Sequence, residues 1–470
     1  MQGWRRGKLY LILFLLLAGI FLRVWGIGDK SLWLDEAVSF HYADPFHQSV
    51  PSLIKEVKAV DAHPPLYYLL LHFWLEPLRL INRGKVIYSP SQVFPEGYVR
   101  FPSALIGILS LFIFYFLVKG KKWGWILLLF SAFHIYYSQE ARNYSLVLFF
   151  ALLSLFALRK PEKINWGLLI LSWIGGLYTY LYFFLFILSE DVWFLFFQRK
   201  RKILLSLLLS HVILFLTFLP YLPASIHRIL SLPRIPVNVT PEYHILSFFY
   251  APVHLAFGEV LPFPAYYIFL LFLFLSSIIF LPFFQKPRKE DWLYFITLFF
   301  PLIVSAFLPV KSHLFEAKHI IFSLPPLLIL VSNGIGAMQK RFVPFFLSLF
   351  LFGNIVSYGF YRSAHFQKEP WKTAVSWVEK KEARDSVVLL DPDFTGYPFD
   401  FYYQGKMKRW GYRGKIPAAK RLFLVQDKSL VSYPSSTLPK ELGKSYLRRE
   451  EKMFPGYQGL IKITLWKKKS

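Results

Sequence analysis

The sequence predicts an all-α polytopic membrane protein with about eleven transmembrane helices (range about 10 to 13), followed by a small C-terminal α/β domain. Three observations support this fold class. Of the 470 residues, 55% are hydrophobic and 20% are aromatic, and the mean hydropathy is +0.41. Repeated windows of about 16 to 20 residues carry almost no charge, which is typical of membrane-spanning helices. Beyond residue 361 such windows cease.

The charge of the chain orients these helices. It carries 54 Lys and Arg against 28 Asp and Glu, a net charge of +26. Because the basic residues lie in short clusters between apolar windows, they indicate cytoplasmic loops rather than a nucleic-acid surface. The absence of cysteine excludes disulfides and thiolate metal sites. The clusters are Arg5–Lys8, Lys119–Lys122, Arg159–Lys163, Arg199–Lys202, Lys286–Lys289 and Lys340–Arg341.

The first apolar segment is expected to be an uncleaved span rather than a signal peptide, because no small-x-small cleavage site follows it. With the N-terminus in the cytoplasm, residues 9–27 cross outward, and residues 28–63 form the first external loop. Residues 64–82 are apolar, but a crossing there would invert the later basic clusters, so we expect a helix along the outer surface. The remaining crossings are expected at 101–118, 123–138, 143–158, twice within 164–197, and at 203–221, 262–283, 292–309, 319–337 and 342–359.

This topology defines a transmembrane domain, residues 1–360, and an extracytoplasmic α/β domain, residues 361–470. Helical spacing predicts a helix at 371–384. The segments SVVLLD, RLFLVQD and GLIKITLW predict three strands. No residue of this domain forms a catalytic constellation.

Polar motifs gather on the predicted outer face. Charged groups at membrane depth cost roughly 2.5–3.5 kcal/mol each and usually face a cavity or one another. We therefore expect an external cleft in which acids and bases compensate, able to accept an anionic lipid head group. The residues expected there are Asp35, His63, Glu140, Arg142 and Lys318.

Four motifs in order carry a family resemblance: WLDEAVSF, AHPPLYYLLLHFW, RFPSALIGILSLFIFYFL and YYSQEARNYSL. They resemble the GT-C membrane glycosyltransferases, in particular the bacterial branch related to protein O-mannosyltransferases and the lipid A aminoarabinose transferase. The resemblance is strong over roughly residues 10–190 and weaker over 200–340. In the C-terminal domain it covers mainly WKTAVSWVEK and FYYQG.

The resemblance implies an inverting hexosyl- or pentosyltransferase that takes a sugar from a polyprenyl-phosphate donor on the extracytoplasmic face. It implies that Asp35 is the general base, because an acceptor hydroxyl is a poor nucleophile until a carboxylate takes its proton. A cation must also neutralise the departing phosphate. Lys318-His319 departs from the Arg-Tyr common in the family, and lysine lacks the bidentate fork of arginine. The expected substrate-binding residues are Glu36, His63, Glu140, Arg142, Tyr144, Lys318 and His319.

Each of these residues also has a structural interpretation. Asp35 could cap a helix, Glu36 could be solvated, His63 could start a helix before two prolines, and Glu140 and Arg142 could pair with each other.

The remaining expectations concern ligands and location. A divalent metal is possible at Glu36, His63 and Glu140, but the spacing is not diagnostic and no cofactor is certain. The expected partners are the lipid-linked donor, a glycan, glycolipid or protein acceptor, and membrane lipids, without nucleic acid. The expected location is the bacterial plasma (inner) membrane. A transporter or flippase and an oligosaccharide ligase remain alternatives, and the sequence names neither the sugar nor the acceptor.

Overall fold

The computed structural model describes residues 2–61, 63–118, 124–231, 241–259, 265–285, 287–307, 316–363, 366–428, 437–457 and 459–469, so the predicted basic cluster Lys119–Lys122 lies outside it. The chain forms two compact units. One comprises Met1–Trp25, Val50–Tyr67 and Phe101–Tyr361, and the other Gly26–Ser49, Tyr68–Arg100 and Arg362–Ser470. Residues 26–49 and 68–100, assigned above to the transmembrane domain, therefore pack with the C-terminal residues.

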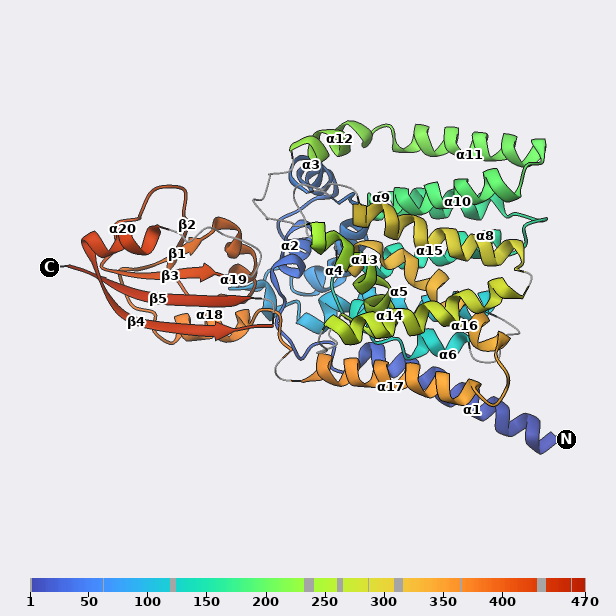
Figure 1. Cartoon of the computed structure of the whole chain (residues 1–470). Coiled ribbons are helices and arrows are strands. Elements are labelled where there is room, and N and C mark those ends of the chain that lie inside the picture. The colour runs from blue at the N-terminus through green and yellow to red at the C-terminus, as the bar shows by residue number, and fades with distance from the viewer. Residues whose placement is uncertain are drawn as a thin grey trace. The chain divides into compact units, whose positions relative to one another are not determined.

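The first unit is built from helices (Figure 1). Among the described residues, six apolar segments are long enough to cross a membrane: Glu96–Leu117, Arg201–Phe218, Tyr266–Phe284, Lys289–Phe307, Ala317–Ala337 and Val343–Arg362. Tyr10–Val24, Tyr144–Leu158, Trp166–Thr179 and Leu246–Phe257 are shorter apolar helices. That the chain has several apolar helices is confirmed, whereas the count of eleven and the orientation stay predictions. The elements are α1 (Gln2–Val24), α3 (Val50–Val60), α5 (Glu96–Leu117), α6 (Gly124–Leu129), α7 (Ala132–Ser138), α8 (Tyr144–Leu158), α9 (Trp166–Thr179), α10 (Phe183–Phe197), α11 (Arg201–Phe218), α12 (Leu222–Ser231), α13 (Pro241–Phe257), α14 (Ala265–Phe280), η2 (Leu281–Phe284), α15 (Lys289–Phe307), η3 (Ala317–Ser323), α16 (Leu324–Ala337) and α17 (Val343–Arg362).

The outer surface of this unit is apolar. On α11, six large aliphatic or aromatic side chains are each about half or more exposed. A soluble protein rarely leaves such a continuous apolar surface in water, so this helix faces lipid. The side chains are Leu205, Leu208, Leu209, Val212, Phe215 and Leu216.

The apolar stretch expected to cross at 123–138 is broken into α6 and α7, and the cause is a buried arginine. Arg23 on α1 donates from its guanidinium to the carbonyl oxygens of Leu128 and Leu129 at 2.8 and 3.1 Å, in the last turn of α6, where helix carbonyl oxygens need donors from outside the helix. The hydroxyl of Ser131 then accepts the N–H of His134 at 3.3 Å and starts α7. A hydropathy pattern cannot register either contact.

The external segment expected after residue 221 contains two helices, α12 and α13. The latter is largely buried at its C-terminal end, where Val253, Leu255 and Ala256 are inaccessible to solvent. It packs against α14, α15 and η3 and is thus part of the core, not a surface loop.

The second unit contains a five-stranded sheet of order β2-β1-β3-β5-β4, in which β1 pairs in parallel with β2 and β3. Helices cover both faces because side chains alternate along a strand. Leu422 and Leu424 of β3 pack with α20, and Phe423 between them meets Trp377 of α18. The elements are α2 (Leu34–Ala43), α4 (Leu66–Ile81), η1 (Pro90–Gln92), α18 (Trp371–Glu379), β1 (Ser386–Asp391), η4 (Asp393–Thr395), α19 (Gly396–Tyr402), β2 (Lys408–Gly411), β3 (Arg421–Asp427), α20 (Leu438–Ser445), β4 (Tyr446–Pro455) and β5 (Leu460–Lys468).

The three strands expected from apolar runs are β1, β3 and β5, and the small C-terminal sheet is confirmed. The two strands that the sequence analysis missed, β2 and β4, are the two edges of the sheet. Edge strands are often charged and exposed, and β4 reads YLRREEKMFP. They therefore lack the apolar signal of a central strand.

Two glycines on α16 provide a matched test of the helix packing. A Cβ at Gly334 would lie 2.0 Å from the carbonyl oxygen of Ile278 on α14, whereas nothing lies within 4 Å of one at Gly336. We expect Gly334→Ala to lower the free energy of unfolding by about 2 kcal/mol, because backbone must move. Gly336→Ala should leave it unchanged or raise it by up to about 1 kcal/mol. Thermal unfolding in detergent checks both, and equal Tm values for the two variants would contradict this packing.

Candidate active site

Asp35 lies in the first turn of α2, where the free N–H groups of the helix favour a negative charge. Its side chain is partly exposed. The hydroxyl of Ser39, one turn on, donates to the backbone carbonyl of Asp35 at 2.9 Å. Asp35 thus occupies a defined place at a helix N-terminus and is partly exposed.

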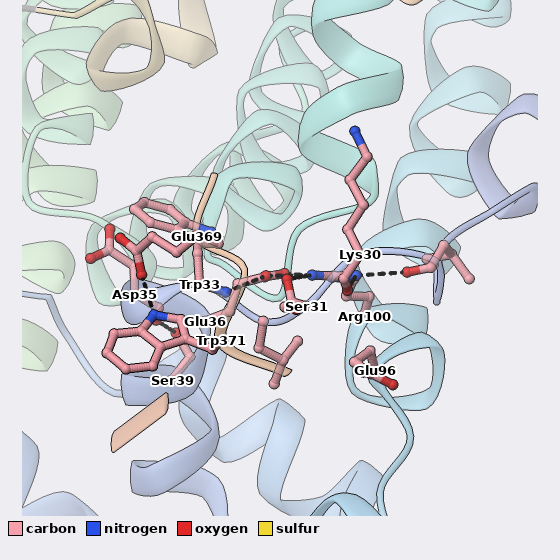
Figure 2. Close-up of polar contacts among 12 residues, drawn as sticks. Lys30, Ser31, Trp33, Asp35, Glu36, Ser39, Glu96, Arg100, Glu369 and Trp371 are labelled. Atoms are coloured by element: carbon pink, nitrogen blue, oxygen red, sulfur yellow. Dashed lines mark hydrogen bonds and ion pairs between the residues drawn. The ribbon is translucent and has the colours of Figure 1, made fainter. Parts of the chain in front are cut away.

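Glu36, the adjacent acid, has the opposite environment. It is 1% exposed, and its two carboxylate oxygens accept from Nε and Nη2 of Arg100 at 2.7 and 2.6 Å (Figure 2). The other donors of Arg100 reach the carbonyl oxygens of Ile27, Lys30 and Ser31 at 2.8–2.9 Å. All five N–H groups of the guanidinium therefore have an acceptor. The carboxylate of Glu36 is held in a buried bidentate ion pair.

The N-terminus of α2 has a further contact from a distant part of the chain. Glu369 accepts the backbone N–H of Leu34 at 2.9 Å and the indole N–H of Trp371 at 2.6 Å. Figure 2 draws its carboxylate next to Asp35. Burial, followed by the charge of Asp427, raises the pKa of Glu369 to about 7, and Asp35 adds to the increase.

In the first unit, His63 is held by Asp61. The Asp61 carboxylate accepts the backbone N–H of His63 at 2.7 Å and contacts its Nδ1 at 2.9 Å. Burial raises the pKa of Asp61, but the hydrogen bonds and charge of His63 and the charge of Arg142 outweigh it and lower this pKa to about 2. Asp61 is therefore an anion at neutral pH, and it fixes the orientation of the imidazole.

Four rings follow one another across this region. The ring of His63 stacks on Tyr180 at 5.3 Å between centroids, Tyr180 stacks on Tyr182 at 5.5 Å, and Tyr182 stacks on His319 at 5.9 Å. The interplanar angles are 12–22°. The stack joins His63 and His319, two predicted site residues far apart in sequence.

The two predicted phosphate-binding cations belong to the same region. The guanidinium of Arg142 lies 6.0 Å from the ring centroid of Tyr144, and Lys318 pairs with Glu316 at 2.6 Å. Tyr144 is also an electrostatic neighbour of Lys318. We call this group the polar cluster of the first unit; it comprises Asp61, His63, Arg142, Tyr144, Tyr180, Tyr182, Glu316, Lys318 and His319.

Glu140, two residues before Arg142, is buried. It is 4% exposed and is hydrogen-bonded by Tyr136. The neighbouring Tyr137 donates to Glu259 at 2.6 Å and stacks edge-on with Tyr144 at 4.7 Å.

The described residues give a metal ion no obvious site. No group of three His, Asp or Glu side chains among them could hold one. Of the residues named for this role, both carboxylate oxygens of Glu36 accept from Arg100, and His63 contacts Asp61 through Nδ1. We therefore derive no step through a metal.

A cavity of about 1320 Å³ lies in the second unit and holds none of the predicted site residues. It opens where the parallel strands β1 and β2 end, a usual place for ligands in α/β sheets. Two of its arginines are paired with acids, Arg409 with Asp400 and Arg413 with Asp393. Its wall also includes His41 and Tyr397, whose rings lie 4.6 Å apart.

Several partners of the site residues escaped the sequence analysis. Asp61 directly precedes the motif AHPPLYYLLLHFW and Arg100 begins RFPSALIGILSLFIFYFL, yet only contacts reveal their roles. Glu369 precedes the WKTAVSWVEK pattern and carries no signal of its own. The ring stack uses Tyr180 and Tyr182, which lie outside the four motifs.

Solved structures share this fold at low identity. The chain is similar to ArnT from Cupriavidus metallidurans bound to undecaprenyl phosphate, with 12% identity and a TM-score of 0.56 over 96% of this chain and 98% of that one. It is also similar to the archaeal oligosaccharyltransferase AglB from Archaeoglobus fulgidus in complex with an inhibitory peptide and a dolichol-phosphate. That match has 11% identity and a TM-score of 0.52 over 86% of this chain and 64% of AglB. No family model and no curated protein matches. The expectation that the chain shares the fold of the lipid A aminoarabinose transferase is confirmed.

The Arg100 ion pair gives a direct test of how α2 is held. Arg100→Lys keeps the charge but loses the fork, so it leaves Glu36 and several loop carbonyl oxygens unsatisfied in a buried place. We expect the free energy of unfolding to fall by about 3 kcal/mol. Arg409→Lys, at a half-exposed ion pair with Asp400, should change it by less than about 1 kcal/mol. Thermal unfolding of the two variants in detergent makes the comparison, and similar Tm values would contradict the assignment.

Proposed function

We propose that this protein is an inverting glycosyltransferase of the plasma membrane that moves a sugar from a polyprenyl-phosphate donor to an acceptor hydroxyl, with Asp35 as the general base. The fold it shares with ArnT and AglB supports the enzyme class. Those proteins were solved with undecaprenyl phosphate and dolichol-phosphate, which supports a lipid-linked donor.

The observation that carries this proposal is the contrast between Asp35 and Glu36. Two adjacent carboxylates have different environments, since Glu36 is buried against Arg100 and Asp35 is partly exposed at the start of α2. A base must be held rigidly and yet reach its substrate. The ion pair of Glu36 supplies the rigidity, and the exposure of Asp35 supplies the reach. Glu36 is accordingly assigned to structure rather than to substrate binding.

The reaction balances without a cofactor. Asp35 takes the proton of the acceptor hydroxyl while the oxygen of that hydroxyl attacks the anomeric carbon. The bond from that carbon to the phosphate oxygen breaks, and the electron pair leaves with polyprenyl phosphate. Because this leaving group departs as a stable anion, it needs a cation rather than a proton. One displacement inverts the anomeric centre.

The polar cluster of the first unit supports the phosphate-binding role. Arg142 and Lys318 bring two cations into a largely buried region that is lined by tyrosines. A phosphate there would gain charge-assisted hydrogen bonds in a low dielectric. The apolar helices of the same unit suit the polyprenyl chain.

A second candidate is transfer of a lipid-linked oligosaccharide, since AglB is an oligosaccharyltransferase with the same fold. The two candidates share the chemistry and differ in donor size. A donor panel that includes single sugars and oligosaccharides separates them.

The first functional prediction concerns Asp35→Asn. Purified protein in lipid receives a panel of undecaprenyl-phosphate sugars and an envelope extract as acceptor, and release of undecaprenyl phosphate is measured. The variant should lose at least about 100-fold in rate, because an amide cannot take the proton. Its affinity for undecaprenyl phosphate should stay within about two-fold of wild type. Asp385→Asn, at an exposed aspartate paired with Lys420, is the matched control and should keep full activity.

The outcomes of that assay are distinct. Equal release by wild type and Asp35→Asn would remove Asp35 from catalysis. Binding of the lipid by wild type with no release for any donor and acceptor would favour the transporter or flippase.

A second functional prediction concerns Lys318. We expect Lys318→Met to weaken binding of undecaprenyl phosphate about ten-fold or more, because a charge-assisted contact is lost. Lys318→Arg should preserve binding, because the charge remains. Titration of the labelled lipid into each variant in detergent measures both. Unchanged affinity in Lys318→Met would exclude Lys318 as a phosphate contact.

A further inference from the structure

The N-terminus of α2 is capped only in part by its own residues: Oε2 of Glu36 accepts the backbone N–H of Trp33 at 3.4 Å. The residue before the helix, Trp33, has no side-chain oxygen to accept a hydrogen bond from the first turn. The first free backbone donor, the N–H of Leu34, is instead taken by Oε2 of Glu369 at 2.9 Å. Just before it, the N–H of Leu32 is taken by the hydroxyl of Tyr402 at 2.7 Å. Groups more than 300 residues away thus complete the start of the helix that carries Asp35.

Glu369 is itself held in one orientation. Its Oε2 also accepts the indole N–H of Trp371 at 2.6 Å, and Trp371 is completely buried. Glu369 is also buried, with only 6% of the residue exposed. Because this carboxylate is fixed within the C-terminal segment, its hydrogen bond with Leu34 fixes the start of α2 relative to that segment.

The charges around Glu369 are mostly negative. Asp35 faces it from α2 and Asp427 from the end of β3, and both raise its pKa in addition to the larger effect of burial. The nearest cation along the chain, Lys368, lies 3.7 Å over the ring of Trp33. With its pKa raised to about 7, Glu369 changes its charge near neutral pH.

We infer that Glu369 is a positioning residue for the proposed base: it holds the first turn of α2, and through it the carboxylate of Asp35, in the geometry that the reaction needs. The inference rests on the proposed function, in which Asp35 takes the acceptor proton. It goes further because the sequence analysis assigned no role to any residue of the C-terminal segment.

The contact has a consequence for the pH dependence of the rate. Above pH 7 Glu369 is an anion, and its negative charge beside the reacting groups favours transfer of the acceptor proton toward it. Below pH 7 Glu369 is neutral, and this effect disappears. The rate of transfer should therefore rise several-fold between pH 6 and pH 8 in the wild type.

Two variants separate the hydrogen bonds from the charge. Glu369→Gln keeps an acceptor oxygen for Leu34 and Trp371 but cannot ionise. It should keep the rate that the wild type has at pH 6 and should show no rise toward pH 8. Glu369→Ala removes both the acceptor and the charge, so its kcat should lie about ten-fold below that of Glu369→Gln at every pH, with the KM for the donor within about two-fold. The rate of undecaprenyl phosphate release from the active donor is measured for the wild type, Glu369→Gln and Glu369→Ala.

The control is Glu382→Gln, because Glu382 also accepts a backbone N–H, that of Lys406 at 2.8 Å, and this contact involves no residue of α2. It should reproduce the wild-type rate and pH profile. Amide hydrogen exchange of the segment 33–37 gives a readout that needs no activity, and Glu369→Ala should speed exchange there while Glu382→Gln should not.

The results distinguish this inference from the proposed function. If Asp35→Asn is inactive while Glu369→Ala and Glu369→Gln match wild type in rate, pH profile and exchange, Glu369 is not a positioning residue. If Asp35→Asn is fully active, the proposed base fails, and with it the catalytic role of Glu369, whatever the exchange data show. Slower turnover with faster exchange in Glu369→Ala, together with the flat profile of Glu369→Gln, supports the inference.

Discussion

The second unit depends on one buried guanidinium. A charge taken out of water must have all of its donors satisfied, and Arg100 meets this requirement with two oxygens of Glu36 and three carbonyl oxygens of the loop 27–31. The same contacts fix the path of the chain into α2. The position of Asp35, one residue before Glu36, follows from them, because a helix that begins at a fixed point carries its first turn with it.

This constraint explains why two acids stand together in a chain that has few. Glu36 is used to hold the helix, and Asp35 is left at the surface of its first turn. In the first unit the charges are arranged differently: Asp61 orients His63, and Arg142 and Lys318 lie among tyrosines. Fixed dipoles and charges of this kind are what transfer of a sugar from a phosphate requires, since they need not reorganise during the reaction.

The architecture could be predicted wherever burial leaves a periodic pattern. Long apolar windows and three apolar strands mark elements surrounded by lipid or by core, and these were found with nearly correct bounds. The failures have a common cause. The break at Ser131 depends on Arg23, more than a hundred residues away, and the strand 446–455 is polar because it is an edge. Neither property lies in the local composition.

By itself, the sequence determined that the chain is an apolar helical protein with a small C-terminal α/β part, and four ordered motifs indicated the GT-C fold. It also indicated Asp35, Arg142 and Lys318 as candidate site residues, because a charge next to an apolar helix costs free energy and is therefore rare there. Only the tertiary structure decided what each charge touches. Hydrogen bonds and ion pairs act over about 3 Å, so Arg100 and Glu369 acquire their roles only when the fold brings distant segments together.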